Sequence, residues 1–141
     1  MTDWQHELGD FFQQKKATHA ELERSELERF ITGVAMPAYL ELQAELEKHE
    51  RHVSIRETPT AATLVVQYQG ADEFWYCLQG RTLPEGVVPF AEMVVRERKG
   101  IRRIRTESMI RQGGDYGVSD ITHGEVIGHF LTHYKRSIRE E

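Results

Sequence analysis

The sequence predicts one α+β domain, in which an antiparallel meander of about five strands is covered on one face by helices. A long, Pro-interrupted N-terminal helical region and a C-terminal helix supply the cover. Apolar residues alternate with polar ones between residues 53 and 110, and helical spacing precedes and follows that region. The connections between alternating segments are short, which favours antiparallel pairing of consecutive strands.

Composition bounds the class of protein. The length of 141 residues fits a single domain over residues 1–141, with residues 1–17 as a more loosely attached segment. The formal net charge of −5 disfavours general affinity for nucleic acid or anionic membranes. The single cysteine, Cys77, excludes an internal disulfide and a cysteine-rich metal site. The chain starts without a signal-peptide pattern and has no membrane-length apolar run, so we expect a cytoplasmic protein without a membrane partner.

The N-terminal residues carry two helical signals. Four apolar side chains recur at helical spacing: Trp4, Leu8, Phe11 and Phe12. We interpret them as a short turn whose aromatic rings dock on the body of the protein. Thr18 and Glu21 form a capping-box pattern, which predicts that a helix begins at Thr18.

Pro37 divides the helical pattern that follows. Its ring clashes with the preceding turn and is expected to push Met36 toward an extended backbone. Two alternatives stay open: a second helix that begins at Pro37, or one long helix with a kink there. The helical region is expected to end near residues 49–51.

The segment from Ala62 to Leu78 is the densest apolar stretch and predicts a hairpin. A three-residue connection at residues 70–72 would place Val66 opposite Tyr76. That odd length keeps the apolar residues of both strands on one face, since a one-residue slip would move them to the other face. The predicted core face comprises Leu64, Val66, Tyr68, Phe74, Tyr76 and Leu78.

The opposite face of this hairpin is half apolar. It presents Val65, Trp75 and Cys77, and we predict that a homodimer forms through these residues, because Trp is enriched at the centres of interfaces and polar groups at their rims. The predicted rim comprises Gln67, Glu73 and Gln79. The segment from Trp4 to Phe12 is the competing cover for this face and would leave a monomer.

Two flanking segments join this hairpin to the rest of the predicted sheet. Val53 and Ile55 mark a short strand that ends in a turn at residues 58–60. Residues 81–89 contain Pro84, Gly86 and Pro89, and this composition predicts a loop.

A second hairpin, at residues 91–110, carries concentrated positive charge. A turn at Lys99-Gly100 would place Val95 opposite Ile104 and bring two arginines together across the strands. Between residues 96 and 111, seven basic residues against two acidic ones give a local excess of +5. The candidate anion-binding residues are Arg96, Arg98, Arg103 and Arg105, because arginine donates paired hydrogen bonds to phosphate. The competing interpretation is an edge hairpin kept soluble by charge, or one paired with the protein's own acidic residues.

The final helix has the clearest start signal. Thr122 and Glu125 form a capping box, and Ile121 and Val126 form a hydrophobic staple around it. One apolar face follows: Ile127, Phe130, Leu131, Tyr134 and Ile138.

Two histidines lie on the same helix, His129 and His133, four residues apart and in line with Glu125. We interpret this stripe as exposed and opposite the core. Helical histidines at this spacing can share a metal, but no second ligand-bearing element accompanies them. No metal and no cofactor are therefore expected.

No nucleophile–base motif or paired carboxylate of recognisable context is present, so we favour a non-enzymatic cytosolic binding or adaptor protein. It would act as a homodimer and engage a protein or anionic partner. One alternative is a nucleic-acid-associated protein that uses the Arg hairpin 96–105. The other is a small-ligand-binding domain with a pocket between helix and sheet. The candidate pocket residues are Tyr39, Tyr68, Phe74 and Tyr76.

Overall fold

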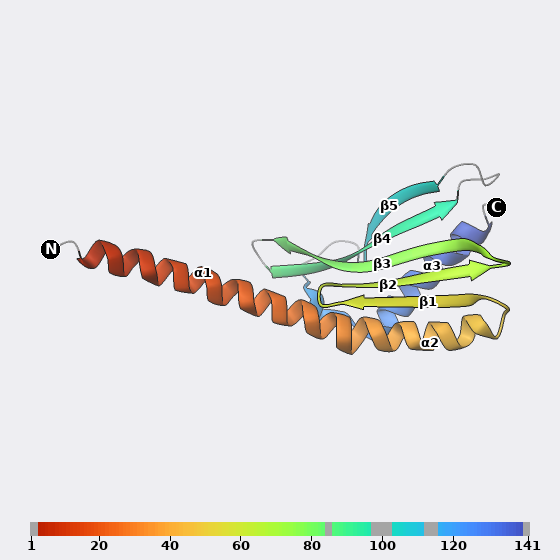
Figure 1. Ribbon diagram of the computed structural model, residues 1–141, viewed down its shortest axis with the longest axis horizontal. Coiled ribbons are helices and arrows are strands. Elements are labelled where there is room, and N and C mark those ends of the chain that lie inside the picture. Colours follow the sequence, from red (N-terminus) through yellow and green to blue (C-terminus); the bar gives the residue numbers. More distant parts are fainter. Residues whose placement is uncertain (1–2, 84–85, 97–102, 112–115, 140–141) are drawn as a thin grey trace.

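A computed structural model of the chain describes residues 3–83, 86–96, 103–111 and 116–139. A long helical rod leads into a five-stranded antiparallel sheet, and a C-terminal helix follows (Figure 1). The predicted fold class is therefore confirmed. None of the helices in the described residues is long and apolar enough to cross a membrane.

The helical rod has three parts. Helix α1 (Asp3–Phe30) passes through a π-helical segment (Ile31–Ala35) into helix α2 (Met36–Glu47). Pro37 lies in the first turn of α2, where its missing N–H is tolerated, and the wider π turn precedes it. The predicted extended backbone at Met36 is wrong, because Met36 is helical with φ −64°.

The two expectations for the N-terminal segment are also corrected. No helix begins at Thr18, because α1 already runs through it from Asp3. The residues from Trp4 to Phe12 do not dock on the body: they belong to a helix that extends away from the sheet (Figure 1, red).

The sheet has the order β1-β2-β3-β4-β5. Its strands are β1 (His52–Thr58), β2 (Ala61–Tyr68), β3 (Ala71–Leu83), β4 (Gly86–Arg96) and β5 (Arg103–Met109). The loop predicted at residues 81–89 is wrong, because β3 and β4 pair along most of it, with Gly80 opposite Pro89. The absence of a side chain at Gly80 also lets α1 pack closely against β3, because a Cβ built there would lie 2.7 Å from a methyl carbon of Leu27.

The central hairpin keeps the predicted faces but not the predicted partners. Gln69 and Gly70 both have positive φ and form the turn, as tight two-residue hairpin turns require. Val66 therefore pairs with Phe74, not with Tyr76. A bulge at Glu73 adds one residue to β3, so the side-chain alternation of the two strands stays in phase.

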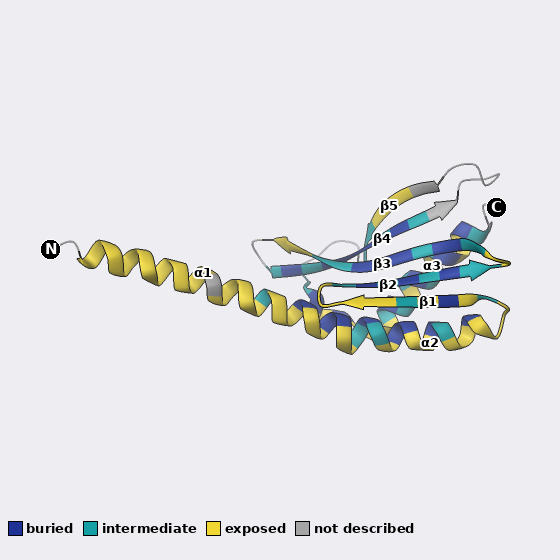
Figure 2. Ribbon diagram, in the orientation of Figure 1, coloured by how far each residue is buried: buried dark blue, intermediate teal, exposed yellow. Residues whose placement is uncertain are grey.

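The core lies between the helices and the inner face of the sheet (Figure 2, dark blue). Five of the six predicted core-face residues are buried: Leu64, Val66, Phe74, Tyr76 and Leu78. The sixth, Tyr68, is half-buried beyond the bulge, where the Arg51 guanidinium carbon lies 3.9 Å from the centre of its ring. Tyr39 of α2 donates a 2.7 Å hydrogen bond to the Ala62 carbonyl and so ties the rod to β2.

The second hairpin has the predicted register. Val95 pairs with Ile104, and Arg96 pairs with Arg103. The predicted turn at Lys99-Gly100 lies outside the described residues.

Helix α3 (His123–Arg139) begins as its sequence predicts. The Glu125 backbone N–H donates to the Thr122 hydroxyl at 3.2 Å, and the Thr122 N–H donates to the Glu125 carboxylate at 3.4 Å. Both staple residues, Ile121 and Val126, are buried. This capping box satisfies two N–H groups that the helix itself leaves without an acceptor.

Thr122→Ala is expected to lower the free energy of unfolding by about 1 kcal/mol, because it removes the hydroxyl acceptor at the N-cap. Urea denaturation would measure the loss. Thr132→Ala is the matched control: Thr132 is an exposed residue within α3 whose hydroxyl donates to the Gly128 carbonyl, so no cap is lost there. Equal stability of Thr122→Ala and the unmutated protein would contradict the assignment.

Candidate functional site

Among the described residues, the most exposed apolar surface belongs to residues 3–22, which we call the projecting half of α1. Every residue of it whose side chain is described is exposed (Figure 2, yellow). Its large apolar side chains are Trp4, Leu8, Phe11, Phe12 and Leu22, exposed by 63%, 49%, 58%, 56% and 58%. Sequence patterning had identified the spacing of the first four but not their exposure.

All of these side chains except Phe12 follow one line along the helix together with two polar residues. We call this line the α1 stripe: Trp4, Leu8, Phe11, Lys15, Thr18 and Leu22. The intervals alternate between four and three residues, which is the heptad spacing of a helix–helix seam. The body cannot bury this line. Leu27 is the first buried residue of α1, and it lies about 140° around the helix from Leu22, at roughly 100° per residue.

The outer face of the sheet carries the residues predicted as a dimer interface. Val65 and Trp75 are directly paired and half-buried, but Cys77 is only 5% exposed. The Thr63 hydroxyl lies 3.3 Å from the Cys77 sulfur and donates to it, and burial raises the pKa of the thiol. Cys77 therefore offers little surface and little reactivity.

A polar network lies beside Trp75 on the same face. The Gln79 amide donates to Glu92 at 3.2 Å, and Arg105 binds the other carboxylate oxygen of Glu92 at 3.0 Å. The Arg105 guanidinium lies 6.0 Å from the centre of the Trp75 ring. A hollow of about 400 Å³ adjoins Trp75 on its other side and is lined largely by polar side chains of β1, β2 and β3. This face is thus more polar than the core of a permanent interface.

Of the four candidate anion-binding residues, the structure describes one side chain. Arg105 is exposed and paired with Glu92 of the neighbouring strand. The register brings Arg96 opposite Arg103, as predicted, but their side chains and the whole of Arg98 lie outside the described residues. Anion binding by this hairpin stays a prediction.

The candidate pocket residues lie mostly within the packed core. The Tyr39 and Tyr76 rings meet edge to face with centroids 6.3 Å apart, and the Phe74 and Tyr76 centroids are 6.0 Å apart. All three side chains are almost fully buried, whereas Tyr68 stacks beneath Arg51 outside this cluster. Their aromatic contacts include one another and α3, where the Phe130 ring centroid lies 5.1 Å from that of Tyr76.

The interpretation of His129 and His133 as an exposed stripe is wrong. His129 Nδ1 lies 2.7 Å from the Tyr76 hydroxyl, and its Nε2 lies 3.0 Å from the Ser108 hydroxyl. The two imidazole centroids are 4.4 Å apart. The arrangement brings a serine and a histidine within hydrogen-bonding distance, but burial and the neighbouring His133 lower the pKa of His129 to about 4. Such a weak base activates a serine poorly near pH 7.

Glu125, the third member of that stripe, bonds elsewhere. Its carboxylate accepts two hydrogen bonds from Arg111, at 2.7 and 2.8 Å, and these hold the pKa of Glu125 below its usual value. Among the described residues, no three potential ligands gather around one metal position.

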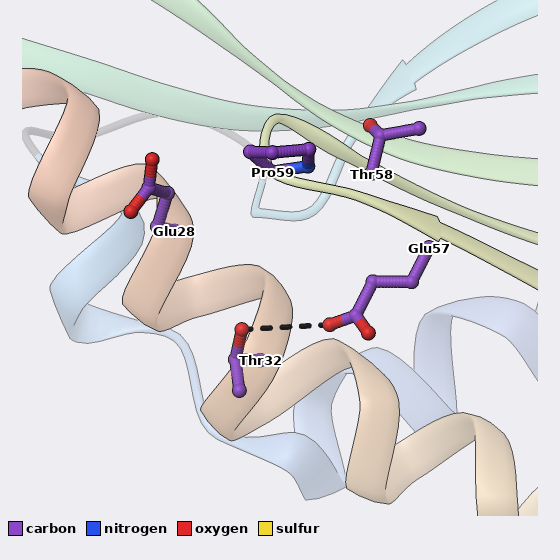
Figure 3. Close-up of a pocket in the computed structure, with 5 residues that line it drawn as sticks. All are labelled: Glu28, Thr32, Glu57, Thr58 and Pro59. Carbon is purple, nitrogen blue, oxygen red and sulfur yellow. Dashed lines mark hydrogen bonds between the residues drawn. The ribbon is translucent and has the colours of Figure 1, made fainter.

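An acidic hollow of about 330 Å³ lies where the rod meets the end of β1 (Figure 3). Glu28 and Thr32 line it from the rod, and Glu57, Thr58 and Pro59 line it from β1 and its turn. The Thr32 hydroxyl donates to Glu57 at 3.4 Å. The remaining carboxylate, Glu28, is exposed to solvent.

Comparison with protein-family models, with curated proteins and with solved structures finds no match for this chain.

Proposed function

We propose that this protein is a non-enzymatic binding protein that works as a homodimer, and that two copies associate through the projecting half of α1. The observation that carries the proposal is the α1 stripe with the adjacent Phe12: five large apolar side chains, each about half exposed or more, on a helix that leaves the body.

Helix stability supports a partner for this segment. A helix without tertiary contacts is marginal in water, because most helical stability in proteins comes from packing of an amphipathic face. The projecting half of α1 includes Gly9, which weakens a helix interior by about 1 kcal/mol relative to alanine. Burial of the stripe against a partner would supply the missing packing.

The exposed area matches a second copy of the chain. With about 150–250 Å² per aromatic side chain, the stripe and Phe12 expose on the order of 500 Å² of apolar surface in each copy. Two copies together would bury about 1,000 Å² of apolar area, and flanking polar groups bring the total into the usual range for specific interfaces, about 1,200–2,000 Å². Aromatic residues are also enriched at the centres of such interfaces.

The sheet face around Trp75 supports a homodimer less well. Cys77 is covered, and Glu92 and Arg105 are already paired across that face. The dimer predicted through Val65, Trp75 and Cys77 is untested and becomes the alternative to the α1 dimer, and the experiment below separates the two surfaces.

The unmutated protein is expected to sediment as a dimer at tens of micromolar. Leu8→Glu combined with Phe11→Glu is expected to give a monomer, because four charges would enter the shared seam. The control is Leu40→Glu, which changes an exposed leucine of α2 away from the stripe and is expected to leave the dimer intact. Trp75→Glu tests the sheet face in the same way and is expected to leave the dimer intact.

A monomer for the unmutated protein at that concentration would overturn the proposal. Dissociation by Trp75→Glu but not by the α1 double variant would move the interface to the sheet face. Circular dichroism supplies a second measurement, since the monomeric double variant is expected to lose helical signal from the projecting half of α1.

A further inference from the structure

We infer that the two copies pair antiparallel along the α1 stripe, with Trp4 of each copy against Leu22 of the other. This inference rests on the proposed homodimer and adds which residues of the partner copy complete each half of the interface.

The spacing of the stripe is the same from either end. Its intervals are four, three, four, three and four residues, so it is symmetric about position 13. An antiparallel pair centred there places Trp4 level with the partner's Leu22, Leu8 level with the partner's Thr18, and Phe11 level with the partner's Lys15. Each larger apolar side chain then meets a smaller or more flexible one, which is how side chains fill a helix–helix seam without voids.

Lys15 disfavours the parallel alternative. In a parallel pair, equivalent positions face each other, so two ammonium groups would share the middle of an apolar seam without a counter-charge. In the antiparallel pair, the aliphatic part of Lys15 packs beside the partner's Phe11 and its ammonium reaches solvent or the ring face.

Charges along the helix agree with the same direction. Asp10 falls level with the partner's Lys16, and Glu7 falls level with the partner's His19. A parallel pair would instead set the acidic first turns of both helices beside each other. Asp3 falls level with the partner's Glu23, which is a like-charge pair and the one contact of this set that opposes the direction; the Glu23 carboxylate also lies 2.7 Å from His19 of its own chain. The helix dipoles of an antiparallel pair also oppose, which is favourable.

The two bodies fit this arrangement. Leu22 precedes Leu27, the first buried residue of α1, by five residues, or about 7.5 Å of helix. The partner's Trp4 therefore reaches the end of the stripe more than one turn before Leu27, the first side chain that the body buries. The bodies stand at opposite ends of the helix pair, whereas a parallel pair would bring them to the same end.

Disulfide cross-linking tests the direction. Trp4→Cys and Leu22→Cys are made separately in a Cys77→Ser background, and each retains the four inner residues of the stripe: Leu8, Phe11, Lys15 and Thr18. In the antiparallel pair, the two copies of position 4 are about 27 Å apart, far beyond the Cα separation of a disulfide. Each variant alone is therefore expected to give no cross-link under mild oxidation, and an equimolar mixture of the two is expected to give a cross-linked dimer.

The outcomes separate this inference from the proposed function. Cross-linking of Trp4→Cys with itself would overturn the antiparallel direction and leave the α1 homodimer standing. A sedimenting dimer that gives no cross-link in either sample or in the mixture would overturn the antiparallel pair centred on position 13, and the Leu8→Glu, Phe11→Glu variant would then decide whether the interface lies on α1. A monomer in sedimentation would overturn both.

Discussion

Glu73→Ala is expected to lower the free energy of unfolding by about 1–3 kcal/mol, because it leaves the buried Tyr134 hydroxyl without its acceptor and removes the counter-charge of the half-buried Arg51. The Glu73 side chain is only 8% exposed. Its carboxylate accepts hydrogen bonds from Arg51 at 3.3 and 3.1 Å and from the Tyr134 hydroxyl. One side chain therefore joins β3 to the segment after α2 and to α3.

Two further variants serve as comparisons for the stability loss of Glu73→Ala. Glu73→Gln keeps an acceptor for Tyr134 and for one N–H of Arg51, so its loss in urea denaturation is expected to be smaller than that of Glu73→Ala. Glu107→Ala breaks the Arg81–Glu107 pair, whose side chains are 47% and 52% exposed, and is expected to cost less than 1 kcal/mol. Similar losses for Glu73→Ala and Glu107→Ala would show that the buried pair contributes little.

Glu73 also shows what apolar patterning encodes. Alternation on β2 and β3 specified which residues face the core, but it did not specify their partners. The tight turn at Gln69-Gly70 shortens the connection, and the bulge at Glu73 restores the phase, so Val66 meets Phe74 while both stay buried. The bulge also turns Glu73 from a predicted rim position toward α3.

Local helix signals were accurate only where tertiary structure agreed with them. The capping box at Thr122 starts α3 because residues 118–120 form a separate 3-10 turn just before it. The same pattern at Thr18 does not begin a helix, because Thr18 lies inside α1 and the N–H groups that follow it already bond within that helix. Spacing of Trp4 and Phe11 predicted a helical face correctly but could not tell whether the chain's own body or another molecule covers it.

The histidines of α3 were misplaced for a related reason. Phe130 and Tyr134 define the buried side of α3, and by helical spacing alone His129 falls toward its edge. Ser108 of β5 reaches this edge, as its contacts with His129 and His133 show. No periodicity within α3 reports the position of β5, so only the tertiary structure reveals that His129 is enclosed.

The enclosure of His129 makes stability depend on pH. Burial and His133 lower the pKa of His129 to about 4, against about 6.5 in the unfolded chain. Above pH 6.5 the imidazole is neutral in both states and the folded protein keeps its full stability. As the pH falls from about 6.5 to about 4, the unfolded chain takes up a proton that the folded protein does not, so the free energy of unfolding declines.

The decline attributable to His129 is expected to be about 1–2 kcal/mol, less than the full shift implies because part of the ring reaches solvent. His133 adds to it in the same direction, since burial and Arg136 lower its pKa. Urea denaturation between pH 7.5 and 4 would measure the slope for the unmutated protein, for His129→Gln and for His52→Gln, an exposed control on β1. Of the two variants, only His129→Gln is expected to show a shallower slope. This variant also loses the hydrogen bonds to Tyr76 and Ser108, which lowers its stability at pH 7.5 but does not set the slope. Parallel slopes for all three proteins would mean that His129 takes up its proton in the folded state as readily as in the unfolded chain.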